Sequence, residues 1–144
     1  MKKYKKFLIG MMIVISCFIV LMWVNQPERK IFSMVQKNQT VYAMAAEAVL
    51  HGEEKPKLEG VSQIHLRVGK HAVVDFFVSG FGIAPSSTYY GFYYSPEDLA
   101  LPYLEERAVL TECEEDAWSW QGSGDNRGVT KKIADCWYYY EASF

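Results

Sequence analysis

The chain has 144 residues, of which 50% are hydrophobic and 22% charged, and its net charge at pH 7 is −2. This length suits one domain, and the composition excludes a disordered tail or a collagen-like repeat. Charge is divided along the chain, because residues 1–30 carry six Lys or Arg and one Glu, whereas residues 31–144 carry nine Lys or Arg and sixteen Asp or Glu. The acidic part would repel phosphate, which argues against nucleic acid as a partner.

Residues 7–24 form an uncharged run of eighteen residues that follows four lysines. A helix of that length covers about 27 Å, close to the hydrocarbon thickness of a bilayer. Basic residues mark the cytoplasmic side of a membrane helix. We therefore expect residues 1–26 to be a cytoplasmic basic tip with a single-pass membrane anchor, and residues 27–144 to be an extracytoplasmic domain at the cell membrane.

Three other interpretations of the run are a cleaved secretory signal, a lipoprotein signal and a buried helix of a soluble core. The last is disfavoured because four lysines flank so uniform a run. A cleaved secretory signal needs small residues at its cleavage point, and residues 23–27, WVNQP, offer none. Residues 14–17, VISC, resemble the lipobox of bacterial lipoproteins, which implies lipidation of Cys17. Because an apolar stretch follows where a lipoprotein has a polar tether, we favour Cys17 as a small apolar residue of the membrane helix.

Signals for a second helix follow the run. Pro27 suits a first helical position, Glu28 lies where the helix dipole favours negative charge, and Gly52 is a stop signal. Between them, six residues recur at alternating spacings of four and three positions and would form one face of a helix, apolar except for Asn38. They are Ile31, Val35, Asn38, Tyr42, Ala45 and Val49. One alternative is a short coiled coil with Asn38 as its register-setting polar residue. We prefer an amphipathic helix that packs on the following sheet.

The rest of the chain predicts strands separated by Gly-, Pro- and Asp-rich turns. The expected strands are residues 61–68, 72–78, 88–94, 108–113, 118–121, 129–134 and 137–143. A helix followed by strands indicates an α+β domain. The predicted fold is an N-terminal transmembrane helix, a juxtamembrane amphipathic helix and then an antiparallel β-meander sheet.

Sixteen of the 22 aromatic residues lie in residues 76–144. Because successive side chains of a strand face opposite sides, both faces of the aromatic strands carry rings. One set can fill a core, and the other either packs on the helix and loops or forms a recognition surface for an envelope protein or a glycan. The residues predicted for that surface are Tyr90, Tyr93, Trp118, Trp120 and Tyr139.

Cys113 and Cys136 are the cysteines outside the membrane run. A symmetric hairpin centred between Gly124 and Asp125 places them opposite each other, within the distance that a disulfide requires. An oxidising compartment permits the bond. We predict a disulfide, and the alternative is two separate thiols.

No catalytic constellation emerges from the remaining candidates. The three histidines, His51, His65 and His71, lack metal-ligand spacing, and the acidic residues near Glu114 lack an EF-hand pattern. Asp75 interrupts an apolar strand and is a candidate buried carboxylate. We therefore expect no catalytic residues, no cofactor and no metal.

Four segments carry a family resemblance: YYGFYYSP at 89–96, WSW at 118–120, DNR at 125–127 and WYYYE at 137–141. They resemble small uncharacterised single-pass membrane-anchored proteins of Gram-positive bacteria, over about half of the chain, and this resemblance implies no activity. The general layout also resembles pilins and pseudopilins. However, Lys6 and Met11 stand where pilins have a small residue and a Glu.

The sequence therefore predicts a membrane-anchored domain outside the cell that acts by binding rather than catalysis. Its partners would be the membrane and an envelope protein or glycan. The alternatives are a pilin-like filament subunit and an envelope enzyme without a recognisable motif. An enzyme would need Asp75 or a histidine in a concave pocket beside another ionisable group.

Overall fold

A computed structural model describes residues 11–12, 14–16, 26–83, 86–104 and 107–144. The chain divides into two units, Met1–Lys30 and Ile31–Phe144. The predicted membrane run at residues 7–24 lies mostly outside the described residues, as does Cys17. Within the described ranges, no helix has both the length and the apolar character needed to cross a membrane.

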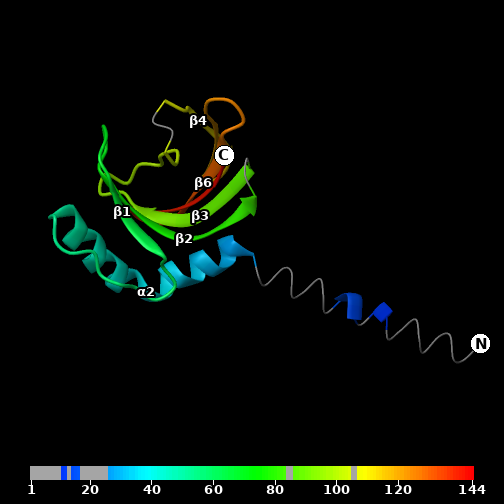
Figure 1. The fold of residues 1–144 in the computed structure, drawn as a ribbon, viewed down its shortest axis with the longest axis horizontal. Coiled ribbons are helices and arrows are strands. Elements are labelled where there is room, and N and C mark those ends of the chain that lie inside the picture. Colours follow the sequence, from blue (N-terminus) through cyan, green and yellow to red (C-terminus); the bar gives the residue numbers. More distant parts are fainter. Residues whose placement is uncertain (1–10, 13, 17–25, 84–85, 105–106) are drawn as a thin grey trace, which may run out of the picture. The chain divides into compact units, whose positions relative to one another are not determined.

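The helix α2 (Pro27–Leu50) covers one face of a curved sheet, as Figure 1 shows for the part in the second unit. It ends where Gly52 adopts a positive φ of 77° and Glu53 donates its N–H to the carbonyl of Ala48. The side chains buried against the sheet are Ile31, Val35, Tyr42, Ala45, Ala46 and Val49. The predicted packing of this helix on the sheet is confirmed.

Asn38 does not lie on the buried face of α2. Its backbone leaves helical geometry, with φ −122° and ψ 22°, and its exposed side chain donates a hydrogen bond to the carbonyl of Met34 at 3.1 Å. The helix is therefore interrupted at Asn38, and this side chain is not a buried register-setting residue.

Seven antiparallel strands follow, close to the predicted positions. They are β1 (Gln63–Arg67), β2 (Val73–Ile83), β3 (Ser86–Tyr94), β4 (Leu110–Glu114), β5 (Ala117–Gln121), β6 (Arg127–Ala134) and β7 (Trp137–Ser143). Aromatic and β-branched residues dominate the central strands, as suits a sheet packed on both faces.

The strand order is β1-β2-β3-β7-β6-β5-β4, so the expected simple meander is wrong between β3 and β4. After β3 the chain leaves the sheet, and it re-enters at the far edge as β4. It then returns strand by strand until β7 pairs with β3. The sheet consists of two three-stranded meanders joined through β7.

Two hydrophobic clusters lie on opposite faces of the sheet. Beneath α2, the rings of Phe76 and Phe92 stack with centroids 4.8 Å apart, and Tyr42 contacts both. The inner face of the curve carries a second cluster, built on Val73, Tyr93, Tyr138 and Tyr140. Residues 95–104, which follow β3, lie within the curve on that face (Figure 1).

Candidate functional site

The predicted aromatic surface is divided between the two faces of the sheet. Tyr90 and Tyr139 belong to the cluster beneath α2, whereas Tyr93 and Trp118 belong to the cluster on the inner face. Trp120 is buried, as are Tyr93 and Tyr139. These five residues therefore do not form one exposed surface, because the register places alternate rings on opposite faces and other segments cover them.

The inner face is covered by residues 95–103, which we call the strap. The main chain of Leu101 is held at both of its polar groups: its N–H donates to the Tyr93 hydroxyl at 2.7 Å, and its carbonyl accepts from Thr130 Oγ1 at 2.9 Å. The Arg67 guanidinium donates to the carbonyl of Pro102 at 2.5 Å. Side chains of three strands therefore bind an extended stretch of backbone.

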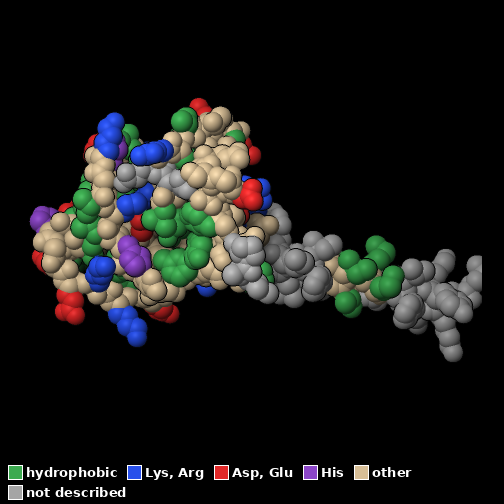
Figure 2. All heavy atoms as spheres, turned by 45° about the horizontal axis from the view of Figure 1, so that its top comes forward, with side chains coloured by type: hydrophobic (Ala, Val, Ile, Leu, Met, Phe, Trp, Pro, Cys, Tyr) green, Lys and Arg blue, Asp and Glu red, His purple; other side chains and the backbone are tan. Residues whose placement is uncertain are grey.

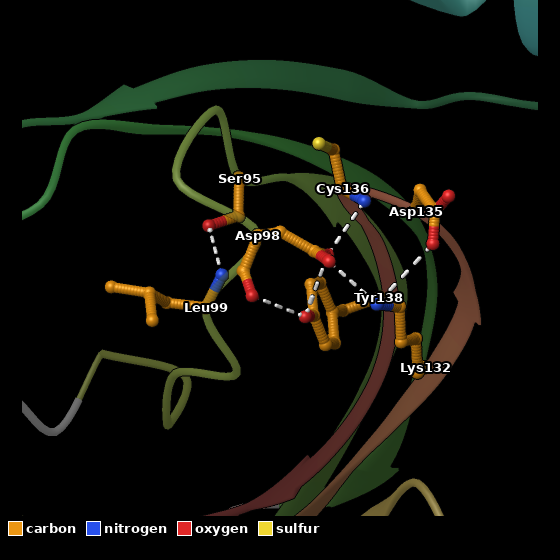
Figure 3. Close-up of polar contacts among 7 residues, drawn as sticks. All are labelled: Ser95, Asp98, Leu99, Lys132, Asp135, Cys136 and Tyr138. Atoms are coloured by element: carbon orange, nitrogen blue, oxygen red, sulfur yellow. Dashed lines mark hydrogen bonds and ion pairs between the residues drawn. The ribbon is translucent and has the colours of Figure 1, made fainter.

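Asp98 fixes the first turn of the strap (Figure 3). One carboxylate oxygen accepts the backbone N–H of Cys136 at 2.7 Å and lies 2.9 Å from the Tyr138 hydroxyl, and the other is 2.6 Å from Lys132 Nζ. The hydrogen bond from Lys132 lowers the pKa of Asp98, and the bonds from Cys136 and Tyr138 lower it further. The carboxylate is therefore ionised and ties the strap to β6 and β7.

A buried ion pair lies beneath the strap. Arg67 Nε is 3.1 Å from Asp75 Oδ2, and Arg67 Nη2 donates to Oδ1 at 3.2 Å. Asp75 is only 3% exposed, and burial raises the pKa of its carboxyl to about 6 although the nearby guanidinium lowers it. Arg67 thus links Asp75 to the strap carbonyl of Pro102.

Stacked tyrosines complete the layer under the strap. The rings of Tyr103 and Tyr140 stack with centroids 4.1 Å apart, and those of Tyr93 and Tyr138 are 5.2 Å apart. Gly91 leaves room for Tyr140, since a Cβ at this position would lie 2.4 Å from the hydroxyl oxygen of Tyr140. Burial raises the pKa of Tyr93, Tyr138 and Tyr140. These phenols stay neutral at physiological pH.

A cavity of about 330 Å³ opens beside the strap. One wall is polar and basic, and the other is formed by apolar residues of the strap and of the segment before β4. The lining residues are Arg67, Gly69, Lys70, His71, Ala100, Leu101, Pro102, Ala108 and Leu110. Figure 2, where this side is turned partly toward the viewer, shows hydrophobic side chains grouped below Lys and Arg side chains. The volume is at the lower end of the range for small-molecule sites.

Asp75 meets part of the requirement for acid–base chemistry, because it lies on a concave face beside another ionisable group. However, its carboxylate is paired with Arg67 and sealed by the strap. In this arrangement a reactant cannot approach its oxygens within hydrogen-bond distance. The geometry instead suits a structural role for the pair and binding in the neighbouring cavity.

The three histidines lie apart from one another. Nδ1 of His71 is 3.0 Å from a carboxylate oxygen of Glu97, His65 contacts Gln63, and Nδ1 of His51 is 2.8 Å from the carbonyl oxygen of Glu47. In the part of the chain that the structure describes, no group of three His, Cys, Asp or Glu side chains is placed to hold a metal ion.

Cys113 and Cys136 are both free thiols in the structure. The predicted hairpin register is wrong, because the chain turns at Glu115 and Asp116 and places Cys113 on β4. The partner of β6 in this hairpin is β5, and Cys136 occupies the turn from β6 to β7. Asp116 adopts positive φ in this turn, which lies between the strands predicted at 108–113 and 118–121. A Gly or Asn is the usual sequence signal for such a position, and neither is present.

Sequence reasoning did not identify the strap or its partners Arg67 and Thr130. Residues 95–98, SPED, did indicate a turn after β3.

Comparison with protein-family models, with curated proteins and with solved structures gives no match.

Proposed function

We propose that this chain is a membrane-anchored module of the cell envelope that acts by binding, with residues 1–26 as its anchor and the α+β domain outside the cell. Support for the anchor comes from the uncharged run at residues 7–24 and the lysines before it. Protease treatment of intact cells tests this topology. The domain should be digested while a cytoplasmic control protein survives, and survival of both would overturn the orientation.

The binding site in this proposal is the cavity beside the strap. The observation that carries it is the contrast between its walls. Arg67, Lys70 and His71 line one side, and the other side is lined by the apolar residues Ala100, Leu101, Pro102, Ala108 and Leu110. On the basic side Lys70 supplies the attracting cation, because Arg67 is paired with Asp75 and His71 lies beside Glu97. A cation attracts an acidic group, and an apolar wall removes hydrocarbon from water. The ligand class is therefore a small molecule or chain end that carries an acidic group on an apolar body.

Octanoate is a suitable probe, with 1-octanol as the uncharged comparison. In isothermal titration calorimetry on the full chain, we expect octanoate to bind more tightly than 1-octanol. Lys70→Met should reduce this preference, whereas Lys57→Met removes the same charge from a loop outside the cavity lining and should not. Equal binding of the two probes, or equal effects of the two substitutions, would overturn the assignment.

A further inference from the structure

The hairpin formed by β2 and β3 presents an unusual side chain to solvent at Phe81. Phe81 is 83% exposed, the largest fraction among the exposed large hydrophobic residues of the described chain. Residues 76–96, which contain this hairpin, include no charged residue and no histidine. An exposed aromatic ring on an uncharged projection is unfavourable in water and suits an apolar or interfacial environment.

This hairpin lies at the same end of the domain as the start of its α2 segment. A Cβ on Gly60 would touch Met34, and Ser62, two residues later, donates hydrogen bonds to the carbonyls of Phe77 and Val78. Met34 therefore lies over the half of β2 that leads into this hairpin. Glu47, near the end of α2, instead interacts with Tyr94 at the far end of β3. Figure 1 shows the same arrangement for the part of α2 in the second unit, whose start lies on the side of the β2 arrowhead.

The length of chain before Ile31 limits how far this end can lie from a bilayer. Ile31 lies seven positions after Val24, the last residue of the uncharged run. Even fully extended, seven residues span at most about 25 Å. If the run is anchored in a membrane, the end of the domain that bears Phe81 is therefore held close to that membrane.

The surroundings of Phe81 suit lipid headgroups. A groove of about 740 Å³ beside it is lined by the hydroxyl residues Ser86, Ser87 and Thr88 and by Arg127, with Asp125 also in the lining. A guanidinium and hydroxyls are donors that match phosphate oxygens, and aromatic rings are favoured at the level of the headgroups.

We propose that the β2–β3 hairpin docks on the bilayer that holds the anchor, with the Phe81 ring in the interfacial layer and Arg127 toward the lipid phosphates. This inference rests on the membrane anchoring proposed above. Docking at a second point would fix the orientation of the domain on the membrane and direct the opposite end, which carries the β1–β2 turn, away from it.

Tryptophan fluorescence of the full chain in vesicles tests the docking. The vesicles contain phosphatidylcholine and phosphatidylglycerol with bromine on the acyl chains near the glycerol, so that indoles at the interface are quenched. The test variant is Phe81→Trp. Its matched control is Val68→Trp, because Val68 is 74% exposed and follows β1 at the other end of β2. Both sites are exposed, and circular dichroism checks that the variants fold.

We expect the fluorescence added by Phe81→Trp to be mostly lost in brominated vesicles, and that added by Val68→Trp to be retained. Equal quenching of the two variants would overturn the docking. Trp23, in the uncharged run, reports on the anchor in the same measurement. Quenching of the unsubstituted chain without extra quenching of Phe81→Trp would reject the docking alone, whereas no quenching of the unsubstituted chain would reject the anchor as well.

Discussion

The carboxylate of Asp98 accepts the main-chain N–H of Cys136 at 2.7 Å, across 38 positions of the sequence. Both residues adopt positive φ, 51° for Asp98 and 66° for Cys136, which places each at the tight point of its own turn. The hydrogen bond therefore joins the turn that begins the strap to the turn between β6 and β7. This hydrogen bond therefore holds the strap in place, together with the contacts that the strap makes with the inner face of the sheet.

Asp98→Asn should loosen the strap with little change elsewhere. Asn tolerates positive φ, so the turn is retained, but the ion pair with Lys132 is lost and the remaining hydrogen bonds are weakened. We expect a loss of about 1–2 kcal/mol in the free energy of unfolding at pH 7, measured by urea denaturation. Hydrogen exchange should accelerate at Leu99 and Leu101, whose N–H groups are bonded within or beneath the strap.

The loss of stability caused by Asp98→Asn should become smaller as the pH falls. The pKa of Asp98 is lowered in the folded protein, so its stabilising contribution is present above its unfolded pKa and disappears as the pH falls through the folded value. The original chain and Asp98→Asn should then converge in stability. A difference that persisted unchanged at low pH would show that the charge of Asp98 is not what holds the strap.

The buried carboxyl of Asp75 should make the stability of the protein depend on pH in the opposite direction. Its pKa is raised from 3.8 to about 6, so the folded protein retains a proton that the unfolded chain has lost. Stability should therefore fall as the pH rises from about 4 to about 6, by about 2–3 kcal/mol. Urea denaturation across this range should show the decline in the original chain.

Asp75→Asn is the control for this decline, because it removes the titrating group with little change in shape. Asn stays neutral throughout this range, so any change in stability that comes from its shape or hydrogen bonding to Arg67 does not vary with the ionisation of residue 75. The comparison therefore concerns the slope between pH 4 and 6, which should flatten. An undiminished slope in Asp75→Asn would assign it to another group.

Gly91→Ala should destabilise the sheet, because the new Cβ would lie 2.4 Å from the Tyr140 hydroxyl oxygen and 2.5 Å from the carbonyl oxygen of Phe76. We expect a loss of about 3 kcal/mol in the free energy of unfolding. Gly80→Ala is the matched control in β2, where the nearest atom is 3.2 Å away on the Tyr89 ring. Its effect should stay within about 1 kcal/mol, and a similar loss in both variants would reject the steric account.

The two thiols of the domain should differ in reactivity toward iodoacetamide. Cys113 is exposed, whereas Cys136 is partly buried and its pKa is raised by burial and by the nearby carboxylates of Asp98 and Asp135. Because the thiolate is the reacting form, Cys113 should be alkylated faster in the folded protein. Mass spectrometry of peptides from unreduced protein measures both rates, and a disulfide-linked peptide would instead contradict the free thiols of the structure.

The helix and the strands could be predicted because their signals are local. Pro27 and Gly52 bracket α2 in the sequence, and the strand from Trp137 was predicted with the bounds that the structure gives. The order of strands could not be predicted in the same way. It depends on β7 pairing with β3, and the residues concerned, such as Tyr94 and Trp137, are far apart in the chain.

The strap shows the limit of sequence reasoning about the site. Residues 99–103 have no regular periodicity, and their place is set by side chains from distant strands, such as Arg67 and Thr130. The residues next to Tyr93 in the sequence do not indicate that its hydroxyl bonds a backbone group of the strap rather than water. The same limit applies to the aromatic residues, because alternation divides them between faces but does not say what covers each face.

The central position of β7 has a consequence for folding. β1–β3 and β4–β6 can each form as a local antiparallel meander, but only β7 joins them into one sheet. Both hydrophobic clusters include residues of β7, so neither core is complete until residues 137–143 have been inserted between two preformed edges. During synthesis, the edges of β3 and β6 would therefore stay exposed until residues 137–143 are available, and these edges are where pairing with another chain would begin.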